Sequence, residues 1–144
     1  MNSPAAQPDR HPLAVQHPDL DEASIRLMVQ TFYGRAREDE LIGPIFNRAV
    51  EDWDEHIGRI SDFWSSMFLK TGRYTGAPMR PHLLLSLQGP HFDRWLQLFE
   101  ATAKDLFAPE LAELFIMRAR RIADSFEMGI ASTRGDLMRP RHSI

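Results

Sequence analysis

Apolar residues recur along this chain at the spacing of amphipathic α-helices, and this pattern restricts the fold more than any other feature. Residues three and four apart share one face of a helix, so such a run forms a continuous stripe. No alternating pattern of the kind that predicts β-strands competes with it. The clearest stripe predicts a helix over about Glu51–Leu69, with Trp53, His56, Ile57, Ile60, Phe63, Trp64, Met67 and Phe68 on its apolar face.

A second stripe predicts an earlier helix that begins at Asp21 and ends in the run Asp39–Pro44, because glycine and proline disfavour its continuation. We expect a short corner with Ile45 and Phe46 to follow. The apolar face of this helix carries Ile25, Met28, Val29, Phe32 and Ala36, with Tyr33 beside it.

Two further helices are predicted to open at Pro90 and Pro109, because proline suits the first helical turn. Together the four long helices define an all-α fold. The apolar positions are Phe92, Trp95, Leu96, Phe99, Ala103 and Leu106 in one, and Leu111, Leu114, Phe115, Arg118 or Ala119, Ile122 and Phe126 in the other.

Between the second and third helices the segment Lys70–His82 contains two glycines and two prolines, which forbid a long regular helix. A break of this length is usually functional or disordered. In this chain the break ends at His82, which makes that histidine a candidate functional residue.

Composition narrows the class of protein. A chain of 144 residues suits one domain, and 43% hydrophobic residues supply a core. The net charge is −3 with both signs interspersed, which argues against a nucleic-acid partner. The chain has no cysteine, which excludes disulfides, thiolate-bound zinc, iron–sulfur clusters and a cysteine nucleophile.

The two ends lack helical periodicity. Residues 1–20 hold four prolines and no apolar run, so they match neither a secretory signal nor a membrane span. We therefore predict a cytoplasmic protein with a disordered leader at 1–20, one helical domain at 21–131 and a flexible tail at 132–144.

Five separated segments resemble the group III truncated haemoglobins, and the likeness extends from about Ile25 to Gly129. The resemblance implies a two-over-two helical sandwich around haem. Since the chain has no cysteine for covalent attachment, it implies haem b held non-covalently. The segments are Phe32-Tyr33; Gly43-Pro44-Ile45-Phe46; Trp53-x-x-His56 with Asp62-Phe63-Trp64-Ser65; Tyr74-x-Gly76-x-Pro78-x-x-x-His82; and His91-Phe92-x-x-Trp95-Leu96-x-Leu98-Phe99.

The resemblance makes His82 the proximal ligand of the haem iron. Neutral imidazole is a good iron ligand, and a segment rich in glycine and proline lets the ring approach the metal freely. Without the resemblance, the residues alone favour a surface histidine beside Pro81 over an iron ligand.

On the distal side the resemblance places Tyr33, His56 and Trp95 as polar groups that meet a bound ligand. Tyrosine and tryptophan bring O–H and N–H donors that need partners when buried. From the residues alone, each is also an ordinary core side chain.

The remaining haem contacts follow by position. Guanidinium groups pair well with carboxylates, so Arg59, Arg73 and Arg80 are candidates for the haem propionates, or else solvated surface charges. The apolar lining of the pocket is expected from Phe46, Ile60, Phe63, Phe92 and Leu96.

Three functions remain open. The first is redox chemistry on O2, NO or a related ligand, such as nitric-oxide dioxygenation or peroxidase-like turnover fed by an external reductase. The second is reversible oxygen transport or sensing of diatomic ligands without catalysis. The third is a haem-free helical module that binds a protein partner through its Met- and aromatic-rich faces.

Overall fold

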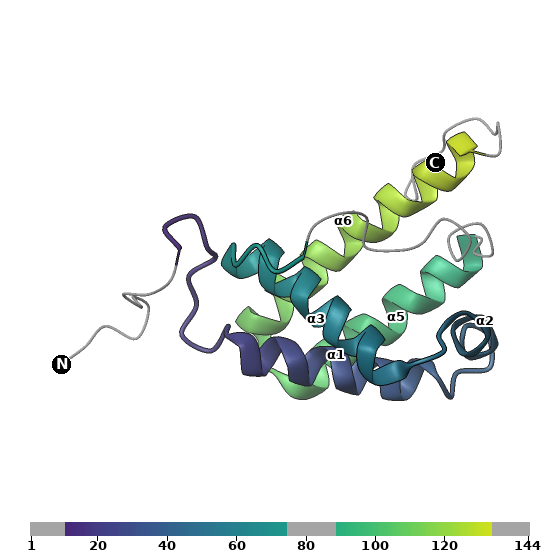
Figure 1. Cartoon of the computed structure of the whole chain (residues 1–144), viewed down its shortest axis with the longest axis horizontal. Coiled ribbons are helices and arrows are strands. Elements are labelled where there is room, and N and C mark those ends of the chain that lie inside the picture. The colour runs from purple at the N-terminus through teal and green to yellow at the C-terminus, as the bar shows by residue number, and fades with distance from the viewer. Residues whose placement is uncertain (1–10, 75–88, 134–144) are drawn as a thin grey trace.

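The computed structural model describes residues 11–74 and 89–133, the last eight of them through their backbone alone. These residues form only α-helices and their connections, with no strand among them, so the predicted all-α class is confirmed (Figure 1). The helices are α1 (Glu22–Ala36), α2 (Gly43–Ala49), α3 (Trp53–Leu69), α5 (Gly89–Leu106) and α6 (Pro109–Thr133).

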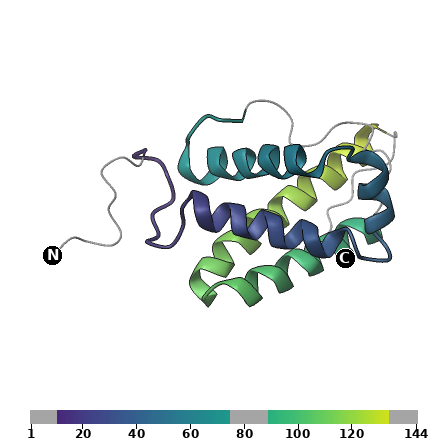
Figure 2. The same cartoon turned by 60° about the horizontal axis from the view of Figure 1, so that its bottom comes forward.

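The long helices are arranged as two pairs. Helix α1 packs against α3, α5 packs against α6, and α1 also contacts α5 (Figures 1 and 2). Helices α1 and α3 run in opposite directions, so the end of α1 lies beside the start of α3. This arrangement brings Tyr33 and His56 together although they are far apart in the sequence.

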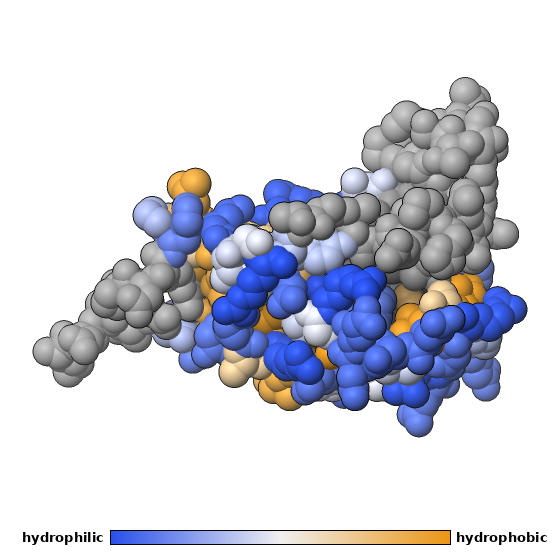
Figure 3. Space-filling model, viewed as in Figure 1, coloured by the Kyte–Doolittle hydropathy of each residue, from blue (hydrophilic) through white to orange (hydrophobic). Residues whose placement is uncertain are grey.

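The core between the two pairs is aromatic. The ring of Trp64 on α3 stacks on Phe99 of α5 at a centroid distance of 5.4 Å, and lies 5.7 Å from Phe115 of α6. Phe68, one turn further along α3, meets Phe115 edge-on at 5.3 Å. Large aromatic side chains bury much area and dominate core energetics. Seen from the side of Figure 1, the described surface is mostly hydrophilic, with apolar colour in smaller separate areas (Figure 3).

The corner predicted to carry Ile45 and Phe46 is instead the helix α2, and this expectation was wrong. Helix α1 ends at Ala36, and Gly43 and Pro44 begin a new helix rather than only ending the previous one. Proline is well suited to the first turn of a helix, where its missing N–H costs nothing. A Cβ atom at Gly43 would lie 2.7 Å from the carbonyl oxygen of Arg37, so only glycine permits this close approach.

Local side chains fix where the helices start. The Asp21 carboxylate accepts a hydrogen bond from the Ser24 N–H at 2.8 Å, and the Ser24 hydroxyl accepts one from the Asp21 N–H at 3.0 Å. Asp52 caps α3 by accepting a hydrogen bond from the Glu55 N–H at 3.2 Å. Such caps satisfy backbone N–H groups that have no partner inside the helix.

The structured part of the chain begins before the predicted residue 21 and ends after the predicted residue 131. Ala14 and Leu20 of the predicted leader are buried, and the Val15 N–H donates to the Phe68 carbonyl at 2.8 Å. Helix α6 continues to Thr133. Among the described residues, no helix combines the length and the apolar character needed to cross a bilayer.

Candidate functional site

Three aromatic rings from α1 and α3 form a triangle at the end of the α1–α3 pair. The ring of Tyr33 lies 5.0 Å from His56 and 5.6 Å from Trp53, and Trp53 lies 5.7 Å from His56. Trp53 and His56 are one helical turn apart on α3, so both reach the same side of that helix. Edge-to-face ring pairs contribute about 0.5–1.5 kcal/mol each beyond the area that they bury.

Tyr33 is the innermost member of this triangle. Its side chain sits deep in the core, where Phe46 of α2 also meets its ring at 5.9 Å. Burial raises the pKa of Tyr33 well above its ordinary value, because the phenolate would lose its hydration. The hydroxyl therefore keeps its proton at physiological pH and is available as a hydrogen-bond donor.

His56 carries a buried nitrogen that is not hydrogen-bonded. Its Nε2 atom has no partner in the part of the chain that the structure describes. Burial lowers the pKa of His56, and the nearby positive charge of Arg59 lowers it further, so the imidazole is neutral at pH 7. A buried polar group without a hydrogen bond costs about 1–3 kcal/mol, so its presence calls for an explanation.

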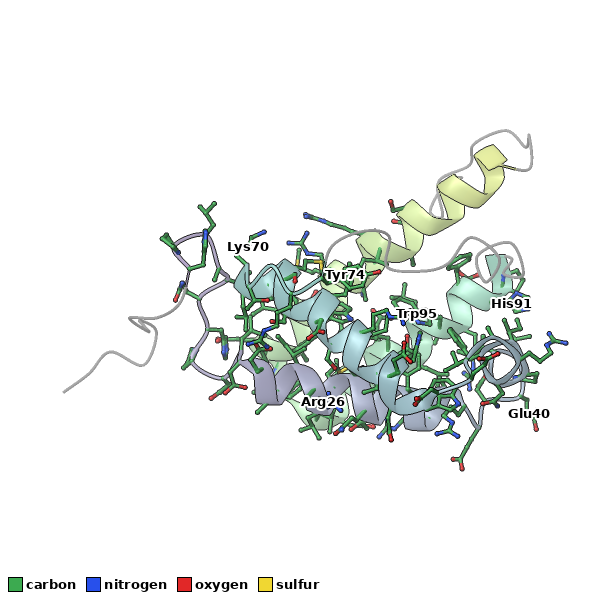
Figure 4. All side chains as sticks on the ribbon, viewed as in Figure 1. Arg26, Glu40, Lys70, Tyr74, His91 and Trp95 are labelled. Atoms are coloured by element: carbon green, nitrogen blue, oxygen red, sulfur yellow. The ribbon has the colours of Figure 1, made fainter. Side chains whose placement is uncertain are left out.

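Trp95 on α5 presents a second nitrogen of this kind. Its Nε1 atom is buried and has no hydrogen-bond partner within 11–74 and 89–133. The indole stacks on Phe99 at 5.4 Å and meets Phe32 at 5.7 Å, and Phe32 in turn meets Tyr33 at 5.1 Å. In Figure 4, the half-buried Trp95 lies toward the middle of the molecule, whereas His91, one turn earlier, lies at the outer end of α5.

The predicted apolar lining is largely inside the molecule. Phe46, Ile60, Phe92 and Leu96 are buried. Phe63 is half-buried and meets Tyr74 edge-on at 5.7 Å. The three predicted polar residues thus lie among hydrophobic side chains, where a hydrogen bond to a ligand is stronger than in water.

Two of the predicted propionate partners already pair with carboxylates of this chain. Arg59 contacts Glu55 at 2.5 Å, one turn away on α3, and Arg73 contacts Glu22 of α1 at the same distance. All four side chains are substantially exposed. The third candidate, Arg80, and the predicted iron ligand His82 lie outside the described residues.

Sequence reasoning gave no role to two residues that belong to this site. Trp53 was placed on the apolar stripe of its helix, yet its ring is the outer member of the triangle. The guanidinium carbon of Arg37 lies 4.6 Å from the centroid of that ring, which is a cation–π contact. The spacing Trp-x-x-His was a signal for Trp53. No signal existed for Arg37, because its position depends on the unpredicted turn between α1 and α2.

Comparison with known proteins decides the family. No family model matches the chain. However, the group 3 truncated haemoglobin ctb of Campylobacter jejuni is 35% identical to it over 113 residues, which are 75% of this chain and 89% of the relative. The chain belongs to the group III truncated haemoglobins. The family and the fold that the sequence resemblance implied are confirmed.

A solved structure supports the same assignment. The crystal structure of a group III truncated haemoglobin from Campylobacter jejuni matches with a TM-score of 0.70 and 33% sequence identity. The match covers 77% of this chain and 91% of that one. The truncated haemoglobins are haem-binding globins, so the buried polar atoms described above belong to a fold built around a haem group. The roles of the individual site residues stay predictions.

Proposed function

We propose that this truncated haemoglobin holds haem b non-covalently through His82 and uses Tyr33, His56 and Trp95 to bind O2, NO or a related diatomic ligand. The observation that carries the proposal is two buried nitrogens, His56 Nε2 and Trp95 Nε1, that have no hydrogen-bond partner among the described residues. They project from α3 and α5, and both side chains reach Tyr33 through ring contacts, directly or through Phe32. Such atoms are expected where a ligand completes the hydrogen bonding.

The residues of the chain fit a haem pocket of this kind. Haem, when bound, supplies an iron that takes up diatomic molecules and exchanges electrons. The Tyr33 hydroxyl and the Trp95 indole N–H donate hydrogen bonds to the ligand, and neutral His56 adds a third polar contact. Phe46, Phe92 and Leu96 exclude water, which strengthens these contacts.

The two described arginines differ in how freely they can turn to a haem propionate. Exposed ion pairs contribute only about 0–1 kcal/mol, so Arg59 can exchange Glu55 for another carboxylate at little cost. Arg73 is less free, because its partner Glu22 also accepts a hydrogen bond from Ser65 at 3.0 Å. We therefore assign Arg59 as the better of these two propionate partners, with Arg80 assigned by sequence alone.

Haem uptake by purified wild-type and variant protein tests the cofactor and its ligand. Wild-type protein mixed with hemin should develop a Soret band, and His82→Ala should lose it or bind hemin far more weakly. His17→Ala, which removes a histidine near the N-terminus, serves as the matched control and should behave as wild type. A Soret band unchanged in His82→Ala would contradict the assignment.

The chemistry that we favour is redox turnover, either nitric-oxide dioxygenation or a peroxidase-like reaction, with electrons from an external reductase. Three polar groups around one ligand stabilise negative charge that develops on it, which slows its release. That is more than reversible storage requires. The test supplies haem-loaded protein with a reductant and follows consumption of nitric oxide or peroxide. Turnover no faster than that of free haem would leave reversible oxygen binding as the function.

A further inference from the structure

The imidazole of His56 is held in an orientation that is unfavourable for its own hydrogen bonding. Its Nε2 atom is buried without a partner in the part of the chain that the structure describes, although the residue as a whole is only half-buried. A rotation about its side-chain bonds would therefore bring this nitrogen into water, where it can form hydrogen bonds. Since an unpaired buried polar atom is unfavourable, other contacts must keep the ring turned inward.

Two ring contacts are available for this purpose. Tyr33 meets the His56 ring edge-on at 5.0 Å with an interplanar angle of 84°, and Trp53 does so at 5.7 Å and 87°. Tyr33 is buried behind the imidazole, whereas Trp53 is half-buried and therefore lies nearer the surface. Trp53 is thus the contact that covers the His56 imidazole on its solvent-facing side.

Trp53 is itself held from outside by Arg37. The guanidinium carbon lies 4.6 Å from the centroid of the indole ring, and cations are attracted to the face of tryptophan more than to the face of any other aromatic side chain. The backbone of Arg37 is also fixed, because its N–H donates to the Tyr33 carbonyl and its carbonyl accepts from Asn47 Nδ2, both at 3.0 Å. The cation therefore comes from a rigid turn rather than from a loose loop.

We propose that Trp53, held in place by Arg37, is a positioning residue that keeps His56 turned toward the bound ligand. The inference rests on the proposed function, because it requires a ligand that His56 contacts. Without the indole, the imidazole turns to solvent and the ligand loses one hydrogen-bonding group. Trp53 acts through His56 and does not touch the ligand itself.

A double-mutant cycle on haem-loaded protein tests this coupling. The variants are Trp53→Ala, His56→Ala and the double variant, and the readouts are the C–O stretching frequency of the carbonmonoxy form and the rate of O2 dissociation. Each single variant should shift the frequency alike and release O2 about tenfold faster, as expected for one lost hydrogen bond. The double variant should show no further change, since both substitutions remove the same contact.

Milder variants separate positioning from a general structural effect. Trp53→Phe keeps an aromatic ring and should restore both readouts to nearly the wild-type values. Arg37→Gln removes the cation and should speed O2 release about two- to threefold, whereas Arg37→Lys should stay closer to wild type. Arg48→Gln, which removes an exposed arginine of α2, is the matched control and should change nothing.

Specific results would overturn the inference. If the effects of Trp53→Ala and His56→Ala multiply in the double variant, the two residues act independently and Trp53 does not position His56. If Trp53→Ala does not fold, the milder variants decide. The inference is overturned if Arg37→Gln leaves the C–O frequency unchanged and Trp53→Phe does not give near wild-type values. Failure of the wild-type protein to bind hemin would instead overturn the proposed function, and this inference with it.

Discussion

Both ends of the antiparallel α1–α3 pair contain polar side chains, but their hydrogen bonding differs. At the end near the N-terminus of α1, the Ser65 hydroxyl is fully buried and donates to Glu22 at 3.0 Å. Thr71 donates to the same hydroxyl at 2.9 Å, and Arg73 completes the network by pairing with Glu22. At the other end, His56 Nε2 is buried and unpaired within the described ranges, as is Trp95 Nε1 on α5, whose ring connects to Tyr33 through Phe32.

Under the proposed function, the first end (the paired end) stabilises the fold and the second (the unpaired end) contacts the ligand. A satisfied polar network rigidifies a protein, whereas unpaired buried groups cost stability and persist where function requires them. Substitutions of the hydrogen-bonded polar groups should therefore change stability, and substitutions of the polar groups proposed to meet the ligand should change ligand binding with little effect on stability. Each prediction below tests one side of this contrast.

The largest effect is expected for Ser65→Val at the paired end. The change removes the hydroxyl that joins Glu22 to Thr71 and adds bulk at a position with no exposed surface. Together these effects should lower the free energy of unfolding by about 3 kcal/mol, measured by urea denaturation. Thr31→Val, at a half-buried position of α1, is the control and should change it by less than about 0.5 kcal/mol. A loss for Ser65→Val no larger than that of the control would refute the contrast.

Asp39→Ala should cost about 2 kcal/mol, because this carboxylate accepts hydrogen bonds from the Leu41 and Ile42 N–H groups and pairs with Arg94 of α5 at 2.7 Å. Burial alone would raise the pKa of Asp39. The hydrogen bonds from Ile42, Arg94 and Leu41 outweigh it, and the pKa lies below the ordinary value.

The stabilisation by Asp39 is therefore complete above the pKa that the group has in the unfolded chain, and is lost as the pH falls through its lower folded value. Denaturation of wild type and Asp39→Ala at a series of pH values checks this sign. The two curves should converge in acid. If the stability curves of wild type and Asp39→Ala converge at alkaline pH instead, the predicted sign of the pH dependence is wrong.

At the unpaired end, Tyr33→Phe should speed O2 dissociation about tenfold, which corresponds to about 1.4 kcal/mol. The free energy of unfolding should change by less than about 0.5 kcal/mol, because the phenyl ring keeps its contacts with Phe32, Phe46 and Trp53. Stopped-flow kinetics and denaturation on the same preparation measure both. A large loss of stability with unchanged O2 release would assign Tyr33 to the fold rather than to the ligand.

The smallest effect is expected for Trp95→Phe. The ring should still stack on Phe99, and the unpaired N–H is removed, so the free energy of unfolding should change by less than about 1 kcal/mol. O2 release should become about threefold faster, since one of three polar contacts is lost. An unchanged rate would show that the indole N–H does not reach the ligand.

The helices could be predicted from the sequence because each presents a long apolar stripe to one core. Helix α2 could not, since it is short and its existence depends on the close approach of Gly43 to the Arg37 carbonyl. The stripe on α3 and the family motifs also pointed to Tyr33, His56 and Trp95. What no local pattern predicts is which buried atoms lack partners, because that depends on every neighbouring helix.

The contact between Val15 and Phe68 shows that the cooperative unit of this protein is larger than its run of helices. The Phe68 carbonyl belongs to the last turn of α3, where such groups have no partner inside the helix, and the residues before α1 supply one. A version trimmed to begin at Asp21 would keep every helix and still lose this bond and the buried Leu20 side chain. In protein engineering, a cut or fusion between Ala14 and Asp21 would therefore remove contacts of the folded protein.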